Sequence, residues 1–361
     1  MSSKPIRIGV IGAGGIVAKM HLPDLAKNPD FKVTLLGGRK ESRLKLLANR
    51  FDIPNWTPNL DDVISDPNVD AVIIGTPHPA HVVWGLKAIA AGKHVLMQKP
   101  LCGDMGEANA FVNAAEKTDR TVLCLPHFSP TIYTIRKSIQ DGAIGRVSGA
   151  RCRTSHGGPE VYYAEVRDLF EESAPANGGG GKADLWFFDS KRAGVGALFD
   201  MGVYAVAHLV ALLGSVKKVT GFVATLDKPT ELEDAATLIL QFESGALATA
   251  ETSWCDPART WELSVHGTAG KFVSPGLNGA DATHWTPTSY TREDSPPRSE
   301  PLSAGPGVGG LHNHFRDCIR EGIQPPLSNA KAARHVTEIL LGGLQSASSG
   351  RAVDIHSRVT A

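Results

Sequence analysis

The sequence predicts a two-domain protein of α/β plus α+β class: a doubly wound parallel sheet, then an open, mainly antiparallel sheet with flanking helices. Three observations predict it. Strands and helices alternate over the first third, strands then follow one another without intervening helices, and a Gly-Ala-Gly turn ends the first strand. The 361 residues, 42% of them hydrophobic, suffice for two cores. We expect domains at residues 1–125 and 126–361.

Short apolar runs alternate with amphipathic stretches in the first domain. This alternation is typical of a parallel sheet with helices on both faces. The expected strands are Ile6–Ile11, Lys32–Leu36, Asp70–Gly75, His94–Met97 and Thr121–Leu125. The expected helices are Ile16–Lys27, Glu41–Phe51, a stretch through Trp84 and Ile89, and Gly106–Lys117.

Turn signals rather than helices separate the apolar runs of the second domain, which favours antiparallel pairing. The expected strands are Arg146–Thr154, Val216–Thr225, Ala235–Phe242, Ala246–Ser253 and Trp261–His266. The expected helices are Thr131–Gln140, Val203–Leu213 and Ala330–Ser346. The composition of Asn177–Lys182 and Pro275–Gly310 predicts loops.

Composition excludes several classes of function. The 37 basic and 37 acidic residues leave no positive excess for a nucleic acid or an anionic membrane. We find neither a signal-peptide pattern nor an apolar stretch that predicts a membrane span. The five cysteines are scattered and never spaced C-x-x-C, and His312-Asn-His314 lacks partners at metal spacing, so we interpret it as a helix start. We therefore expect a cytoplasmic protein without a metal site.

The turn Gly12-Ala13-Gly14, with Gly15 and Ile16 after it, lies between a strand and a helix. Small residues here let the backbone approach a pyrophosphate, whose charge the N–H groups of the helix start bind. The third glycine of the G-x-G-x-x-G fingerprint is replaced by Val17, and an ordinary tight turn is the alternative. Its place after the first strand of an α/β alternation favours a dinucleotide-binding Rossmann domain.

Three cations follow the second strand: Arg39, Lys40 and, one helical turn on, Arg43. Sites that prefer NAD usually place a carboxylate here, and none occurs before Glu41. A cationic cluster suits a 2′-phosphate, so we predict NADP, with NAD as the alternative cofactor. A solvated basic helix start would also explain the cluster.

Several motifs resemble the glucose–fructose oxidoreductase, inositol dehydrogenase and rhizopine-catabolism family (Gfo/Idh/MocA). They run over nearly the whole chain. The matching segments are Ala71–His81, Gly92–Pro100, Ala193–Tyr204, His266–Gly270 and Ser346–Val353. The resemblance implies a Rossmann domain, then an open antiparallel sheet domain that often forms the oligomer contact. It also implies an active site between the domains, beside the nicotinamide.

Two positions depart from the family pattern. The usual Glu-Lys-Pro is Gln98-Lys99-Pro100, and glutamine can bond a cofactor hydroxyl but gives no negative charge to the lysine. The frequent Asp-x-Gly-x-His motif ends in Tyr204, as in the glucose–fructose oxidoreductase and dihydrodiol dehydrogenase branches. The tyrosine therefore stands where the family implies an acid or base.

The resemblance implies three catalytic residues. Oxidation of an alcohol needs a hydride acceptor, the nicotinamide, and a proton acceptor, for which we choose Tyr204. Lys99 would acidify the phenol and hold the reacting oxygen, and Asp200, one helical turn before Tyr204, would bind a substrate hydroxyl. The competing interpretations are a surface lysine, a core tyrosine and a helix N-cap.

The remaining candidates line the cofactor or the substrate. Besides the glycine turn and the cations, the expected cofactor residues are Thr76, Pro77, His78, His81, Gln98 and Lys99. The expected substrate residues are His127, His156 and Trp186.

We predict an NAD(P)-dependent oxidoreductase for a sugar, cyclitol or related polyol, assembled as a homodimer or homotetramer through the C-terminal sheet. Two alternatives stay open. One is a redox-neutral enzyme that cleaves glycosides with a bound nicotinamide; the other is a non-catalytic sugar- or nucleotide-sensing regulator on the same scaffold.

Overall fold

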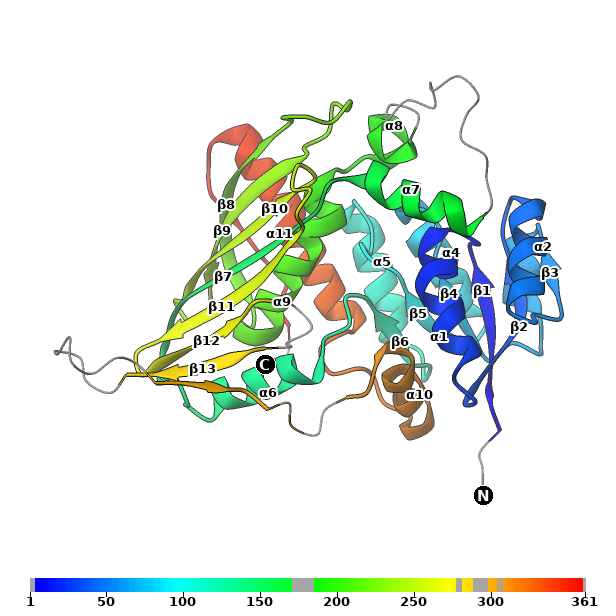
Figure 1. Cartoon of the computed structure of the whole chain (residues 1–361), viewed down its shortest axis with the longest axis horizontal. Helices are drawn as coiled ribbons and strands as arrows, with labels where there is room; N and C mark the ends of the chain where they lie inside the picture. Colours follow the sequence, from blue (N-terminus) through cyan, green and yellow to red (C-terminus); the bar gives the residue numbers. More distant parts are fainter. Residues whose placement is uncertain are drawn as a thin grey trace. The chain divides into compact units, whose positions relative to one another are not determined.

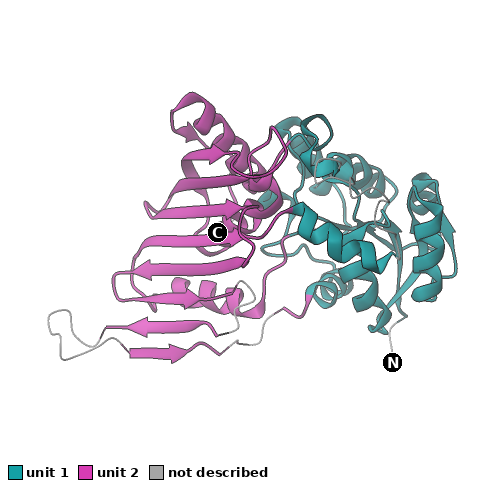
Figure 2. Ribbon diagram, turned by 45° about the horizontal axis from the view of Figure 1, so that its top comes forward, with its two compact units in different colours: residues 1–125, 159–194, 311–334 teal, residues 126–158, 195–310, 335–361 magenta. Residues whose placement is uncertain are grey.

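The computed structural model describes residues 4–170, 185–276, 281–287, 298–303, 305 and 308–359 (Figure 1). The chain forms two compact units (Figure 2). The first contains residues 1–125, 159–194 and 311–334, and the second contains residues 126–158, 195–310 and 335–361. Two later segments thus pack with the N-terminal residues in the first unit. The glycine-rich segment Asn177–Lys182 lies outside the described residues.

The first unit holds a six-stranded, wholly parallel sheet among its described residues, as the sequence predicted. Its order is β3-β2-β1-β4-β5-β6, which is the Rossmann order. The strands are β1 (Ile6–Ile11), β2 (Phe31–Gly37), β3 (Trp56–Thr57), β4 (Ala71–Ile74), β5 (His94–Met97) and β6 (Val122–Cys124). The order changes direction between β1 and β4, and ligands of such sheets bind at the carboxyl ends of these two strands.

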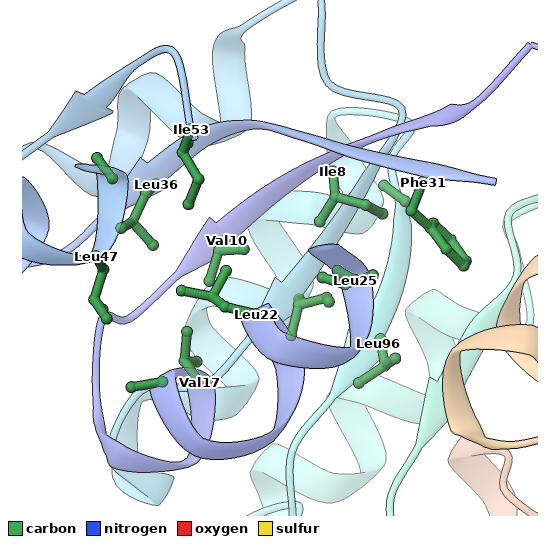
Figure 3. Close-up of a cluster of buried hydrophobic side chains, with 14 of the residues drawn as sticks. Ile8, Val10, Val17, Leu22, Leu25, Phe31, Leu36, Leu47, Ile53 and Leu96 are labelled. Atoms are coloured by element: carbon green, nitrogen blue, oxygen red, sulfur yellow. The ribbon is translucent and has the colours of Figure 1, made fainter. Parts of the chain in front are cut away.

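Both faces of this sheet are buried, which explains its continuous apolar runs. All four residues of β4 are buried, and Ile8 and Val10 of β1 are fully so. Figure 3 shows these two side chains in one cluster with Val17, Leu22 and their neighbours. Each such burial stabilises the fold by about 1.5–3 kcal/mol relative to an exposed side chain.

Helices cover the parallel sheet. The stretch expected as one helix over Ile16–Lys27 is a π-helical turn, η1 (Val17–His21), followed by α1 (Leu22–Ala26). The other helices before residue 126 are α2 (Glu41–Arg50), α3 (Leu60–Ser65), η2 (His78–Ala80), α4 (His81–Ala90) and α5 (Met105–Ala115). Later segments of the unit add α7 (Pro159–Leu169), η4 (Trp186–Phe188), α8 (Ser190–Ala193) and α10 (Leu311–Glu321). The expected helix start at His312 is confirmed, whereas α7 was not predicted.

The second unit holds a nine-stranded sheet among its described residues, in the order β14-β13-β12-β11-β7-β10-β9-β8-β15. Every pairing is antiparallel except that of β7 with β10, which is parallel. Strand β7 lies between β11 and β10, although both follow it in the chain. The strands are β7 (Val147–Ser155), β8 (Val216–Ala224), β9 (Ala235–Phe242), β10 (Leu247–Ser253), β11 (Thr260–Gly267), β12 (Gly270–Ser274), β13 (Thr283–Thr286), β14 (Arg298–Pro301) and β15 (Val353–Asp354). The mainly antiparallel sheet is confirmed.

One face of this sheet is covered by helices. The helices that contribute to the unit are α6 (Pro130–Gln140), the π-helical η5 (Leu198–Gly202), α9 (Val203–Leu213) and α11 (Ala330–Ser349). By length and composition Ser190–Leu213 could cross a membrane, but 89% of its most apolar window is buried inside the protein, which is typical of a core helix. The other face carries exposed apolar side chains, described below.

Candidate active site

The glycine turn lies at the carboxyl ends of β1 and β4. Gly12 has φ +105°, and a Cβ there would lie 2.7 Å from the backbone carbonyl carbon and oxygen of Gly75. The N–H of Gly12 donates to the Gly37 carbonyl and that of Gly75 to the Ile11 carbonyl. Only glycine therefore fits at position 12. At Gly14 the nearest atom to such a Cβ is 3.7 Å away, so the turn leaves the backbone approachable, as a bound pyrophosphate requires.

Gly75 compensates for the missing third glycine of the fingerprint. That glycine normally permits close packing between helix and strand. Val17 occupies its place here, and a Cβ on Gly75 would lie 2.5 Å from the Val17 side chain. The space is thus supplied from β4 rather than from the helix. The glycine after the Ala-Val-Ile-Ile run was the sequence signal for this exchange.

Helix α7 packs against the glycine turn. A Cβ on Gly15 would lie 2.6 Å from Val166 and 2.8 Å from the Tyr162 hydroxyl. Glu165 of α7 also pairs with Lys19. The predicted cofactor residues Gly15 and Ile16 therefore lie beside a helix that no sequence motif predicted.

The three predicted phosphate cations follow β2. Arg39 and Lys40 are exposed, and Lys40 is the residue that precedes α2. The Arg43 guanidinium lies over the Phe170 ring, 4.2 Å from its centroid, a cation–π contact. Two of the three cations thus face solvent directly.

The residues after β4 and β5 are held together by His81. This buried ring places Nδ1 2.7 Å from the Pro100 carbonyl oxygen and Nε2 2.9 Å from that of Thr76. Burial lowers the pKa of His81 to about 4, so the neutral ring donates its one N–H to one of these carbonyls and packs against the other, between the turn of Thr76 and the turn of Lys99. Sequence reasoning placed both turns at the nicotinamide without showing what joins them.

Trp186 and His78 are brought together, although one was predicted for substrate and the other for cofactor. Their ring centroids are 5.2 Å apart. The indole N–H donates to the Tyr163 hydroxyl at 2.7 Å, and His78 Nε2 is 2.7 Å from the Ala193 carbonyl oxygen. Aromatic rings thus collect beside the carboxyl end of β4.

In the second unit Asp200 and His156 face each other. Asp200 Oδ2 accepts from the Trp254 indole at 3.0 Å and lies 3.6 Å from His156 Nε2. His156 Nδ1 accepts from the Gly158 N–H at 2.7 Å, so the proton of the neutral ring is on Nε2 and points toward Asp200. Trp254, which the sequence analysis missed, therefore orients the carboxylate. His127, the third predicted substrate residue, lies half-buried between β6 and α6.

The start of the helical segment that carries Asp200 and Tyr204 is fixed by buried Glu233. Its carboxylate accepts from the N–H groups of Gly196 at 3.0 Å and Leu198 at 3.1 Å, and burial raises its pKa. Asp200 lies in a π-helical turn, a feature frequent at functional sites, and Tyr204 follows in α9 with its ring 5.5 Å from Trp261. Asp200 and Tyr204 belong to the second unit and Lys99 to the first.

Among the residues that the structure describes, no group of three or more His, Cys, Asp or Glu side chains is placed to hold a metal ion. The imidazole of His312 bonds His21. The first unit carries lysine and imidazole groups together with the dinucleotide turn, and the second carries tyrosine, carboxylate and imidazole groups.

Comparison with known proteins matches both units. The description "Oxidoreductase family, NAD-binding Rossmann fold" matches residues 6–125, and the GFO/IDH/MocA C-terminal domain matches residues 132–273. The chain is 24% identical over 329 residues to trans-1,2-dihydrobenzene-1,2-diol dehydrogenase of Macaca fuscata fuscata, covering 88% of each chain.

Two solved structures share the fold. Aldose-aldose oxidoreductase from Caulobacter crescentus, complexed with glycerol, has a TM-score of 0.79 at 21% identity, covering 97% of this chain and 99% of the other. Levoglucosan dehydrogenase in complex with NADH has a TM-score of 0.75 at 20% identity, covering 98% and 100%. The chain therefore belongs to the Gfo/Idh/MocA family and is an oxidoreductase with an NAD-binding Rossmann domain.

Proposed function

We propose that the protein is an NADP-dependent dehydrogenase or reductase of a sugar, cyclitol or related polyol. The observation that carries the proposal is the Asp200 carboxylate, held by Trp254 and faced by the His156 N–H. A carboxylate that is oriented by an indole N–H and an imidazole N–H binds a substrate hydroxyl well, because its remaining lone pairs accept from that hydroxyl. The names of the similar proteins, an aldose-aldose oxidoreductase and a levoglucosan dehydrogenase, favour the same substrate class.

The proposed chemistry assigns one task to each side chain. The glycine turn and the residues after β4 would hold the dinucleotide, whose nicotinamide exchanges a hydride with the substrate carbon. Tyr204 takes the proton of the reacting hydroxyl in oxidation and returns it in reduction. Lys99 stabilises negative charge on the reacting oxygen, and Asp200 binds a second hydroxyl.

A substrate panel tests this proposal. Aldoses, anhydrosugars, cyclitols and trans-dihydrodiols are incubated with the protein and NADP⁺, and absorbance of the reduced nicotinamide is followed. We expect net reduction with at least one class. Glycoside cleavage without net reduction would instead support the redox-neutral alternative, and no turnover with any class would support the sensing alternative.

The preference for NADP rests on exposed Arg39 and Lys40 and on the absence of a carboxylate between Gly37 and Lys40. We expect a lower KM for NADP(H) than for NAD(H). Arg39→Ala with Lys40→Ala is expected to raise the KM for NADP(H) about tenfold or more and to leave that for NAD(H) nearly unchanged, because a charge-assisted phosphate contact is lost. Lys45→Ala, on the same helix, is the matched control. Equal or better use of NAD(H) by the unmodified protein would contradict this preference.

We further propose a homodimer or homotetramer through the uncovered sheet face. Phe222, Ile239 and Leu247 point from that face and are 83%, 48% and 52% exposed. Exposed apolar side chains on adjoining strands are typical of an interaction surface. Light scattering should give a mass above the monomer, and Phe222→Lys with Leu247→Lys should lower it. A monomer at micromolar concentration would overturn this arrangement. The five free cysteines, four of them buried, fit the cytoplasm that we propose as the compartment.

A further inference from the structure

Four side chains of the first unit form a line from the buried residue before Lys99 to the surface. Gln98 Nε2 lies 2.9 Å from His21 Nε2, and His21 Nδ1 lies 2.9 Å from His312 Nε2. His312 Nδ1 is in turn 3.6 Å from Asp24 Oδ2. The first three residues are at most 5% exposed, whereas the Asp24 side chain is 60% exposed. The line joins β5 to η1, α10 and α1.

The direction of the two hydrogen bonds in this line, Gln98 to His21 and His21 to His312, is determined by the Gln98 end. The Lys99 backbone N–H donates to Gln98 Oε1 at 3.2 Å, so the amide oxygen lies on that side and the NH₂ group faces His21. An amide NH₂ only donates, hence His21 Nε2 accepts and its proton is on Nδ1. His21 then donates to His312 Nε2, which leaves the His312 proton on Nδ1, toward the Asp24 carboxylate. The negative charge of Asp24, 3.6 Å from that nitrogen, favours the same tautomer.

Burial supports two neutral rings. It lowers the pKa of His21 to about 3, with a further lowering by His312, and lowers the pKa of His312 to about 4. A neutral imidazole has one donor and one acceptor, which is what each position in the line needs.

We propose that Gln98, His21 and His312 form one polarised hydrogen-bond chain, with the Asp24 carboxylate near its outer end, and that this chain positions Lys99 and requires a donor at position 98. The positioning role rests on the proposed function of Lys99. The chain fixes the Gln98 amide, whose oxygen holds the Lys99 N–H, while the His81 ring contacts the carbonyl of the next residue, Pro100. Gln98 is thus a positioning residue, and its amide is matched to the two histidines.

An ionised carboxylate at position 98 would reverse the chain. It only accepts, so His21 would have to carry its proton on Nε2 and accept from His312 at Nδ1. The unprotonated Nδ1 of His312 would then face the Asp24 carboxylate, and two acceptors would meet. Asparagine at position 24 removes this conflict, because its NH₂ group can donate to that nitrogen.

The experiment uses Gln98→Glu, Asp24→Asn and the double variant of the full chain. Gln98→Glu is expected to keep near-normal kcat at acid pH, where a protonated carboxyl donates, and to lose about tenfold or more at alkaline pH, on the scale of a displaced catalytic group. Asp24→Asn alone should change kcat less than twofold, and in the double variant it should restore most of the alkaline loss. Asp119→Asn, an exposed carboxylate elsewhere on this unit, is the matched control and should restore nothing.

A second readout needs no substrate. Nitrogen-15 NMR of histidine-labelled protein distinguishes protonated from unprotonated ring nitrogens, and His312→Gln assigns the coupled signals. We expect Nδ1–H on both rings of the unmodified protein and Nε2–H on both in the double variant at alkaline pH. An Nε2–H tautomer of His21 in the unmodified protein would overturn the chain.

The kinetic and the NMR measurements distinguish failure of the hydrogen-bond chain from failure of the proposed dehydrogenase function. Expected tautomers with equal alkaline losses in Gln98→Glu and the double variant would overturn the positioning of Lys99 and leave the dehydrogenase proposal standing. A substrate panel without any turnover would remove the dehydrogenase proposal, and the NMR result would still decide whether the chain exists.

Discussion

Lys99→Met and Tyr204→Phe are each expected to lower kcat at least ~100-fold, the usual scale for one acid–base group. Methionine keeps the length of lysine without the charge that stabilises the reacting oxygen, and phenylalanine keeps the ring without the transferable proton. Both effects arise in the transition state, so kcat should fall more than KM rises. Steady-state kinetics on a substrate found by the panel, in both directions, measure this.

Matched controls distinguish chemistry from folding. Lys87→Met removes an exposed lysine paired with Asp61, and Tyr133→Phe removes a hydroxyl from α6 of the second unit. We expect both controls to keep kcat within about twofold, as surface and remote changes usually do. Near-normal turnover in both Lys99→Met and Tyr204→Phe would remove the proposed mechanism. Thermal unfolding of each variant shows whether a loss reflects instability instead.

Acid is expected to destabilise the first unit steeply. His21 and His312 have pKa values lowered to about 3 and about 4 from the ordinary 6.5, because burial disfavours their charged forms. The native state therefore binds fewer protons than the unfolded state, and the stability present above pH 6.5 is lost as the pH falls toward the lowered values. Each histidine contributes about 1.4 kcal/mol per pH unit, so the pair contributes about 3 kcal/mol per unit.

Urea unfolding at a series of pH values between about 6 and 4 measures this slope. His312→Gln, whose amide oxygen can still accept from His21, should remove about half of the pair's contribution. His356→Gln, at an exposed position, should leave the slope unchanged. An unaltered slope in His312→Gln would contradict the assignment of the lost stability to this pair.

The parallel pairing of the first sheet follows from local sequence. Continuous apolar runs such as Ala71–Ile74 need burial on both faces of the sheet. A helix after each run returns the chain to the same edge of the sheet, so that successive strands pair in parallel. The antiparallel strands follow from a different pattern. Buried and exposed residues alternate along Ala235–Phe242, as expected for a strand with one face on the core and one face in solvent. Pattern within one element was sufficient for the class of both sheets but not for all of their strands. Strands β13 and β14 lie in Pro275–Gly310, where loops were predicted.

Contacts between segments that are distant in the chain could not be predicted from the sequence pattern. Helix α7 is placed by Val166 against Gly15, and the Gln98 chain by His21 and His312, which are 291 residues apart. The helical spacing from Asp200 to Tyr204 was also assumed to be α-helical, whereas η5 is π-helical. Such features depend on which side chains meet after folding, and neither periodicity nor a short motif encodes that meeting.

The return of two late segments to the first unit has a consequence for biosynthesis. Val166, Phe170 and Phe315 are buried in the same apolar cluster as Ile8 and Val10. When only residues 1–125 have left the ribosome, the part of the apolar cover supplied by Val166, Phe170 and Phe315 is still untranslated, and the cover is complete only after α10 has emerged. We expect the isolated fragment 1–125 to aggregate or to recruit chaperones, because the apolar side chains that α7 and α10 later cover are exposed during translation.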